Sequence, residues 1–537
     1  MARDKTSSGL LRIPPFPGST AATTLGLGCG QDSGKSDAVI DALMQRICEL
    51  KIGGAYWGSQ PALPPAGYTV LRSHGSWANK ILPGTGHTVE LAPGSAIDPW
   101  HVLSGAAGVV VEGEDELALL AAMAGVPVQC VSEGRFAEVE NATAAALRKM
   151  FRSVAVDRIN YRNPFSGAEM DVAEAIELCG FWRRLIDLNR NLTAAVGFAF
   201  WKRPTVAPLL WGGGQRTPFS SGHRAFRPQD RVAVWKSRTG PKALENLKRS
   251  GATLLEVEDG FIRSAGLGAD CVPPQSIVVD SRGIYFDPNR TSDLEELLQQ
   301  GAIEPEVLLR ARELRDLIVE LGISKYGSGS GKLKRRTTSR HLLVPGQVED
   351  DRAVLLGLGP QSNLELLTKV RRLNPDCYII YKPHPDVEAG HRKGAIPDQE
   401  CLRLADEIVA SEPITSLIDL VDEVHVNTSL AGFEAMLREK SVFTYGVPFY
   451  SGWGLTRDLG PVPARRTARR SIDELVAAAL LLYPRYLDPL TGLPCPAEIL
   501  VRRIAEGNSG TRPTQLVRLR RLQGRLKQTL SSFWPDR

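Results

Sequence analysis

The sequence predicts an α/β protein built on parallel sheets, because short β-branched runs alternate with helix-like blocks from about residue 196 onward. A glycine-rich, basic stretch at 324–340 separates two such blocks. Alternation of this kind is typical of parallel sheets with helices on both faces. We therefore expect two doubly wound, Rossmann-like domains facing a cleft. The expected strands are "RVAVWK", "ATLLEVE", "SIVVD", "HLLVPG", "CYIIYKPH", "EVHVN" and "SVFTYG", and "SDLEELLQQ", "EPEVLLRARELRDLIVEL" and "NLELLTKVRRL" are expected helices.

An internal repeat predicts a further, incomplete copy of this arrangement. "YRNPFSG" at 161–167 recurs as "YLDPLTG" at 486–492. Upstream of the two copies, "SGAAGVVVEGEDELALLAAMAGVPVQCV" and "VDEVHVNTSLAGFEAMLREKSVFTYG" share the order strand, loop, helix, strand. The chain thus reads as a truncated, degenerate first module at about 55–170, followed by a full module at about 196–505. The alternative is two unrelated Tyr-x-(Asn/Asp)-Pro turns, which are common.

These patterns divide the chain into segments. The first is expected to be flexible, because residues 1–35 are rich in Gly, Pro, Ser and Thr. The last carries leucines at helical spacing among arginines, which predicts either a helix lying on an anionic membrane or one docked on the protein body. Gly524 lowers the helix propensity of this segment in either case. The segments are 1–54 (flexible), 55–195 (truncated first module and linker), 196–335 and 336–510 (the two Rossmann-like domains) and 511–537 (basic amphipathic tail).

Composition excludes several function classes. A net charge of +5 suits anionic small molecules or a membrane surface and is too small to indicate nucleic acid. The eight cysteines form no CxxC pair, which argues against a zinc site and favours a reducing cytoplasm. We find neither a secretory signal nor an apolar run long enough to span a membrane. "GLGCGQDSGKS" at 26–36 resembles a P-loop, but the required first glycine would fall on Cys29.

Two acids at the end of one expected strand form the first candidate site. The run "LLEV" reads as buried strand, and Glu258 and Asp259 follow it where Gly260 permits a turn. A carboxylate beside a core is costly unless something there uses it. A catalytic role for Asp259 competes with a local one, either a helix N-cap or a salt bridge to Arg263.

Two further strand ends favour a phosphate site. Lys382 and His384 close the strand "CYIIY", with prolines fixing the loop around the histidine. Thr428 and Ser429 follow the strand "EVHV" and lead into a helix, where hydroxyl and backbone N–H groups bind anions. An ordinary N-cap is the alternative for these hydroxyls. Ligands of open α/β sheets bind beyond the carboxyl ends of the strands, so an acid facing a phosphate cradle indicates a sugar-nucleotide transferase.

At these residues the chain resembles the capsule polysaccharide biosynthesis proteins of the KpsC/LipA type, which are bacterial β-Kdo glycosyltransferases. The resemblance covers most of 230–460. The 55–170 region has neither an acid-acid-Gly motif nor a His-Pro motif, so we expect it to be non-catalytic. The motifs that carry the resemblance are "VEDGFIRSAGLGAD", "SIVVDSRGIYFDPNRTSDLEELL", "LVPGQVEDD", "YIIYKPHPDVEAGHRKG" and "VNTSLAGFEAMLREKSVFTYGVPFYSGWGLTRD".

The resemblance implies a GT-B fold, CMP-β-Kdo as the donor substrate and retention of the β configuration. No acidic cluster suggests a metal, so we expect neither a metal nor a further cofactor. Carried over by position, Asp259 is the catalytic carboxylate, acting as nucleophile or base, with Glu258 as its neighbour. The residues expected at the donor are Lys382 and His384 on the CMP phosphate, Thr428 and Ser429 capping it, and Gly260 and Arg263 beside it.

The resemblance also implies the partners and the location. The acceptor is expected to be a glycolipid primer or a growing Kdo oligosaccharide at the cytoplasmic face of the inner membrane. The protein would then be cytoplasmic, with peripheral membrane contact through its tail. Two alternatives stay open: a transferase for another CMP-ulosonic acid such as sialic acid, and a non-catalytic capsule assembly or export scaffold. The presence of Asp259, His384 and Ser429 favours an enzyme.

Overall fold

The computed structural model describes residues 9–21, 23–28, 33–73, 87–220, 222, 224–263, 272–324, 327–328, 334–390 and 392–507. The chain forms two compact units. Unit 1 is Met1–Leu192 with Leu210–Thr217, and unit 2 is Thr193–Leu209 with Pro218–Arg537. The main break therefore falls close to the predicted boundary at 195/196. The basic tail at 511–537 lies outside the described residues.

Unit 2 contains two sheets, and the first carries the acid motif at one strand end. It has seven strands in the order β22-β21-β12-β11-β10-β8-β9. β10 and β11 are parallel, as predicted, but β12 is antiparallel to β11. The bounds are β8 Leu192–Val196, β9 Phe219–Ser220, β10 Arg231–Val234, β11 Thr253–Asp259, β12 Ser276–Asp280, β21 Pro484–Leu487 and β22 Pro494–Cys495.

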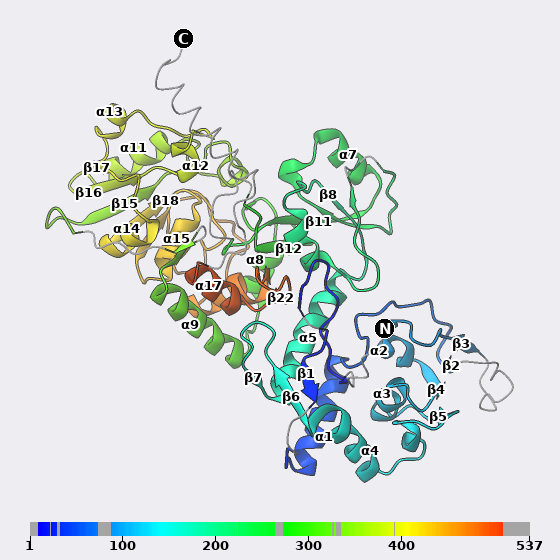
Figure 1. Cartoon of the computed structure of the whole chain (residues 1–537). Coiled ribbons are helices and arrows are strands. Elements are labelled where there is room, and N and C mark those ends of the chain that lie inside the picture. The colour runs from blue at the N-terminus through cyan, green and yellow to red at the C-terminus, as the bar shows by residue number, and fades with distance from the viewer. Residues whose placement is uncertain are drawn as a thin grey trace. The chain divides into compact units, whose positions relative to one another are not determined.

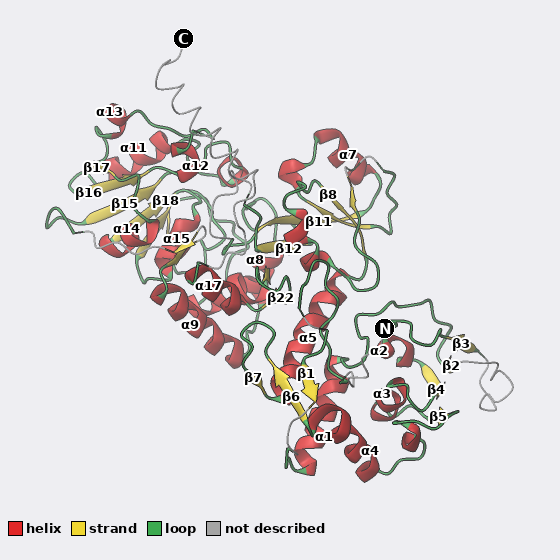
Figure 2. Ribbon diagram, in the orientation of Figure 1, coloured by secondary structure: helices red, strands yellow, loops and turns green. Residues whose placement is uncertain are grey.

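The second sheet of unit 2 is parallel throughout its described pairs, in the order β17-β16-β15-β18-β19-β20. Figure 2 shows helices on both faces, with α11 on one side and α14 and α15 on the other. Strands covered on both faces need continuous apolar runs, as in "HLLVP" of β15, which is buried along its whole length. The bounds are β15 His341–Pro345, β16 Tyr378–Lys382, β17 Glu407–Ile408, β18 Glu423–Val426, β19 Ser441–Thr444 and β20 Arg457–Asp458.

The described helices of unit 2 follow the predicted alternation. They are α6 Arg203–Val206, α7 Pro241–Arg249, α8 Asp293–Gln300, α9 Pro305–Glu320, α10 Arg352–Leu356, α11 Asn363–Leu373, α12 Pro385–Glu388, α13 Asp398–Cys401, α14 Ile414–Leu420, α15 Leu430–Met436, α16 Ile472–Val476 and α17 Ala497–Ala505, with a short pair of strands, β13 Ile323–Ser324 and β14 Gly327–Ser328. Two Rossmann-like domains on an α/β plan confirm the predicted fold class.

The end of the chain returns to the first sheet, which corrects the predicted extent of the second domain, 336–510. β21 pairs antiparallel with β12. Before it, α16 and a π-helical stretch, Ala477–Leu482, pack against α9. α17 also packs on α9, beside which it lies in Figure 1. The apolar run Leu475–Leu480 is buried by this return. Sequence pattern alone does not say which sheet a strand near the end of the chain joins, so the predicted second domain extends too far toward the C-terminus.

Unit 1 is built on a four-stranded parallel sheet, order β3-β2-β4-β5, and a small antiparallel sheet, β1-β6-β7. The strands are β1 Gly26–Gly28, β2 Tyr68–Arg72, β3 Thr88–Glu90, β4 Ala106–Val111, β5 Val128–Cys130, β6 Ile159–Arg162 and β7 Glu169–Met170. The helices are α1 Asp37–Leu50, α2 Pro99–Leu103, α3 Leu117–Met123, α4 Ala144–Phe151 and α5 Val172–Asn189.

The N-terminal segment differs from the flexible 1–54 expected from its composition. Leu10, Leu11, Ile13 and Phe16 are buried, and α1 packs against α5. The glycines and prolines here mark turns between anchored apolar side chains. The described part of this segment is therefore packed into unit 1.

The predicted repeat is confirmed in its local geometry. In each copy a helix passes into a π-helical stretch and then into the repeated strand and turn. The hydroxyls of Tyr161 and Tyr486 donate to the carbonyl six residues earlier, at 2.7 and 2.8 Å. Asn163 and Asp488 each accept backbone N–H groups two and three residues later. The order β3-β2-β4-β5 also matches β16-β15-β18-β19 of unit 2. Chance turns would not share this surrounding structure.

Candidate functional site

The acid motif occupies the carboxyl end of β11. Successive side chains of a strand point to opposite faces, and the ion pairs of this strand follow that rule. Glu256 and Glu258 both contact Arg352, whereas Asp259 contacts Lys202 and Arg263. The two adjacent acids therefore have different surroundings, although they are neighbours in sequence.

Asp259 is held between two cations. Lys202 Nζ lies 3.2 Å from Oδ1, and Arg263 Nε donates to Oδ2 at 2.8 Å. The Lys202 ammonium also sits over the Trp235 ring, 3.3 Å from its centroid. Burial lowers the pKa of Lys202, while the Asp259 carboxylate favours its charged form. Two cations on one carboxylate stabilise its ionised form and fix its orientation.

Glu258, unlike Asp259, lies in surroundings that favour its protonated form. Burial, and next the charge of Asp259, raise the pKa of Glu258 to about 7. The positive charges of Lys202 and then of Arg352, whose Nη1 lies 3.7 Å away, counteract this rise of the pKa only in part. A carboxyl group with this pKa exchanges its proton close to neutral pH, which is the range useful for general acid–base chemistry.

The raised pKa of Glu258 predicts a pH-dependent stability. The folded protein holds this proton between the ordinary value of 4.5 and about 7, whereas the unfolded chain releases it. Stability conferred by the protonated group is therefore present below this window and lost as pH rises through it. Between pH 5 and pH 8 we expect the free energy of unfolding of wild type to fall by about 2 kcal/mol more than that of Glu258→Gln.

Urea unfolding of both proteins at the two pH values measures this difference. Glu313→Gln, at an exposed position of α9, is the control and should leave the pH dependence unchanged. Equal pH dependence in wild type and Glu258→Gln would contradict the assignment.

Glu256 and Arg352 connect the two domains of unit 2. Glu256, with 4% of its side chain exposed, pairs with Lys236 and, at 2.7 Å, with Arg352 Nη1. Arg352 is the first residue of α10 in the second domain, and the carbonyl of the next residue, Ala353, accepts the Thr428 hydroxyl at 3.1 Å. The acid end of β11 therefore lies near the expected phosphate cradle through Arg352.

His384 is the N-cap of α12. Its Nδ1 accepts the Asp386 N–H at 3.1 Å. A neutral imidazole whose Nδ1 accepts carries its proton on Nε2. His384 is thus set up as a donor through Nε2, as expected for a phosphate ligand.

Lys382, at the end of β16, is buried and donates to the Ala410 carbonyl at 2.7 Å. Burial lowers the pKa of its ammonium group. This contact to backbone was not expected. An ammonium has three donors and this bond uses one, so the role of Lys382 on the phosphate stays a prediction.

The hydroxyls after β18 are engaged locally. Ser429 accepts the Ala431 N–H at 3.2 Å, which is the N-cap alternative. Thr428 exchanges hydrogen bonds with Gln347: its N–H donates to Oε1 at 3.0 Å, and its hydroxyl accepts from Nε2 at 3.1 Å. The capping of a CMP phosphate by these hydroxyls stays a prediction.

Gly260 and Arg263 have structural surroundings. A Cβ on Gly260 would lie 2.3 Å from Ser276 Oγ, so close packing of β11 on β12 requires glycine. Arg263, with 1% of its side chain exposed, pairs with Asp259 and donates to the Val272 carbonyl at 2.8 Å. The salt-bridge alternative is therefore the one seen, and Arg263 acts on Asp259 rather than presenting a surface cation.

Sequence reasoning missed several residues around these acids. Lys202 lies in "FAFWKRP", which has no motif, and Arg352 lies just beyond the acids of "VEDD". Asn427 Oδ1 is buried with no hydrogen-bond partner among the described residues. Lone basic and amide residues give no periodic signal, so only the fold could identify them. In the part of the chain that the structure describes, no group of three acidic, His or Cys side chains could hold a metal ion.

The chain is similar to known proteins along most of its length. Residues 230–326 and 327–486 match the family model described as capsule polysaccharide biosynthesis protein. The capsule polysaccharide modification protein LipA of Neisseria meningitidis serogroup A is 36% identical over 415 residues, covering 74% of this chain and 58% of LipA. The lipopolysaccharide-processing protein LpsZ of Rhizobium meliloti is 41% identical over 310 residues, covering 54% of this chain and 70% of LpsZ.

A solved structure agrees with this result. The Thermosulfurimonas dismutans KpsC β-Kdo 2,4 transferase superposes with a TM-score of 0.51 at 31% identity, covering 58% of this chain and 98% of that one. The chain spans little more than half the length of LipA, 58%. The match to LpsZ extends over more than two thirds of that protein. The chain therefore belongs to the capsule polysaccharide biosynthesis protein family.

Proposed function

We propose that this protein transfers β-Kdo from CMP-Kdo to a lipid-linked or oligosaccharide acceptor during capsule polysaccharide biosynthesis. The observation that carries the proposal is the Asp259 carboxylate, held by Lys202 and Arg263 at a strand end. The similarity of the chain to a protein named as a β-Kdo 2,4 transferase supports Kdo as the transferred sugar. The CMP moiety is supported by the acid-acid-Gly and His-Pro motifs.

The chemistry of this transfer suits an ionised carboxylate. Kdo leaves CMP through an oxocarbenium-like centre at a tertiary carbon, and Asp259 bonds to that carbon as the C–O bond to phosphate breaks. The phosphate takes the electron pair and leaves with CMP. An acceptor hydroxyl then displaces the carboxylate and loses its proton. Two inversions give overall retention of the β configuration.

The acceptor's proton passes to solvent. Glu258, whose side chain points toward Arg352 on the other face of β11, is assigned only to the electrostatic surroundings of Asp259. Lys202 and Arg263 are positioning residues, since they orient Asp259 and compensate its charge. His384 Nε2 donates to the departing phosphate and stabilises the charge that develops there.

The role of His384 predicts a large loss of activity without its ring. We expect His384→Ala to lower kcat/KM about 10²- to 10³-fold, because one donor to the developing charge is lost. His384→Asn is the matched variant, since asparagine caps helices well but does not reach as far as Nε2. Initial rates of CMP release measure both. Full activity in His384→Asn would reduce this residue to a helix cap.

Incubation with different donors tests the function itself. Purified protein is given CMP-Kdo or CMP-sialic acid together with a β-Kdo-terminated glycolipid, and transfer is followed by mass spectrometry. We expect product only from CMP-Kdo. Transfer only from CMP-sialic acid would assign another CMP-ulosonic acid, and no transfer from either by folded protein would favour an assembly scaffold.

Location at a membrane remains part of the proposal. No helix within the described ranges is long and apolar enough to cross a bilayer. The basic tail that was predicted to contact the membrane lies outside those ranges.

A further inference from the structure

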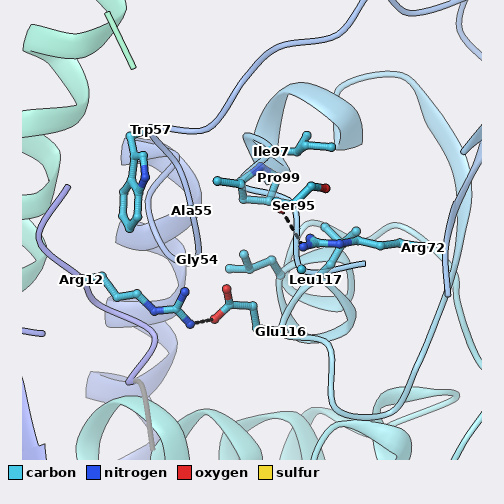
Figure 3. Close-up of a pocket in the computed structure, with 13 residues that line it drawn as sticks. Arg12, Gly54, Ala55, Trp57, Arg72, Ser95, Ile97, Pro99, Glu116 and Leu117 are labelled. Atoms are coloured by element: carbon cyan, nitrogen blue, oxygen red, sulfur yellow. Dashed lines mark hydrogen bonds and ion pairs between the residues drawn. The ribbon is translucent and has the colours of Figure 1, made fainter. Parts of the chain in front are cut away.

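Unit 1 contains a pocket of about 290 Å³ that the proposed transfer reaction does not use. Figure 3 shows Arg12 and Glu116 pointing toward each other, with Arg72 extending toward Ser95. All of the lining residues belong to unit 1. They include Arg12, Trp57, Arg72, Ser95, Glu116 and Leu117.

The repeat shows which part of a module this pocket occupies. Arg72 ends β2, and Glu116 directly precedes α3, the helix that follows β4. By position in the sheet, β2 of unit 1 corresponds to β15 of unit 2, and β4 corresponds to β18. The pocket thus lies at the carboxyl ends of the strands, where ligands of such sheets bind. In unit 2 the corresponding loop carries Thr428 and Ser429.

The residues of this loop differ from those expected to bind the ligand in unit 2. Between β4 and α3 the chain reads "EGEDE", residues 112–116, in place of "NTS". Carboxylates at this place repel a phosphate. The segment after β3 reads "LAPGS", with no lysine or histidine. The strand ends of unit 1 therefore lack the residues expected to hold the nucleotide in unit 2.

The charged groups of the pocket form a balanced set of donors and acceptors. Arg12 Nη2 lies 2.5 Å from Glu116 Oε2, with 22% and 23% of the side chains exposed. Arg72 Nε lies 3.2 Å from Asp115 Oδ2, and Arg72 Nη2 donates to the Ser95 carbonyl at 2.9 Å. One carboxylate and one carbonyl thus hold the Arg72 guanidinium in place beside the pocket that it lines.

We propose that this pocket binds a pyranose ring with vicinal hydroxyls. Glu116 accepts from a hydroxyl pair, the guanidinium groups of Arg12 and Arg72 donate to hydroxyl or ring oxygens, and the half-buried Trp57 indole packs on the C–H face of the ring. The sugar is a residue of the acceptor or product chain, and this part rests on the proposed function. The first module has thus exchanged a nucleotide site for a carbohydrate site.

Titration calorimetry on the full chain tests the proposal with methyl β-Kdo glycoside, methyl α-glucopyranoside and CMP as probes. Wild type should bind one more pyranoside per chain than Glu116→Gln or Arg72→Met, or bind it there at least about tenfold more tightly. CMP binding should be the same in all three. The two glycosides distinguish an acidic sugar of the product from a neutral sugar of the acceptor.

Two further variants keep the test decisive. Trp57→Phe retains an aromatic face and should bind within a few-fold of wild type, so that a folding defect can be separated from lost binding. Asp259→Asn should keep pyranoside binding while losing transfer, so failure of the proposed function leaves this result intact. Equal pyranoside binding by wild type and pocket variants, or loss of one CMP site in those variants, would overturn the proposal.

Discussion

Asp259→Asn should abolish sugar transfer, lowering kcat by at least about 10³-fold. An amide of the same shape neither attacks the anomeric carbon nor compensates the charge that develops on it. Its oxygen still accepts from Arg263, which lies 2.8 Å from Oδ2 in wild type. The fold and CMP affinity should therefore persist. Rates of CMP release and of product formation, together with CMP titration, measure the two effects separately.

Asp398→Asn is the matched control for this prediction. Asp398 is an exposed residue in the first turn of α13, within the second domain. The same chemical change there should leave kcat within twofold or so of wild type, as for most surface substitutions. Turnover by Asp259→Asn close to that of Asp398→Asn would remove Asp259 from the mechanism.

Asp98→Ala should destabilise unit 1 by about 3–5 kcal/mol. The Asp98 side chain is fully buried and pairs with Arg183 at 2.8 Å and Arg190 at 3.0 Å. It also caps α2 by accepting the Trp100 N–H. Its removal leaves two guanidinium groups poorly compensated, with 8% and 11% of their side chains exposed. Urea unfolding and limited proteolysis of the full chain should both show the loss.

Asp187→Ala provides the comparison, because Asp187 pairs with the same two arginines. Its side chain is 40% exposed, so water can replace it. We expect a cost below about 1 kcal/mol there. Equal stability of the Asp98 and Asp187 variants would contradict the role assigned to burial.

Much of the fold was predictable because strand and helix periods are local. The alternating blocks gave the central strands of both sheets in unit 2, β10 to β12 and β15, β16, β18 and β19, and the turn at 161–167 gave the repeat. Pairing direction was not predictable for β12, since "SIVVD" reads alike in parallel and antiparallel sheets. The return of β21 to β12 pairs Ser276 with Tyr486, far apart in sequence, and leaves no local signal.

The site was predictable only in part for the same reason. Strand-end position identified Asp259 and His384, and the structure shows a paired carboxylate and a histidine set up to donate. Because side chains alternate along β11, Glu258 and Asp259 point to opposite faces of the strand. The charged partners that decide their ionisation lie in distant parts of the sequence. Lys202 precedes Asp259 by 57 residues, and Arg352 belongs to the other domain.

Trapping the sugar on the enzyme tests the central claim most directly. Wild-type protein is mixed with CMP-Kdo without acceptor, quenched, digested and analysed by peptide mass spectrometry. We predict one Kdo residue attached to the peptide that contains Asp259, lost on addition of a β-Kdo-terminated acceptor and absent in Asp259→Asn. An adduct on another residue, or β-linked product formed at the wild-type rate by Asp259→Asn, would contradict the account.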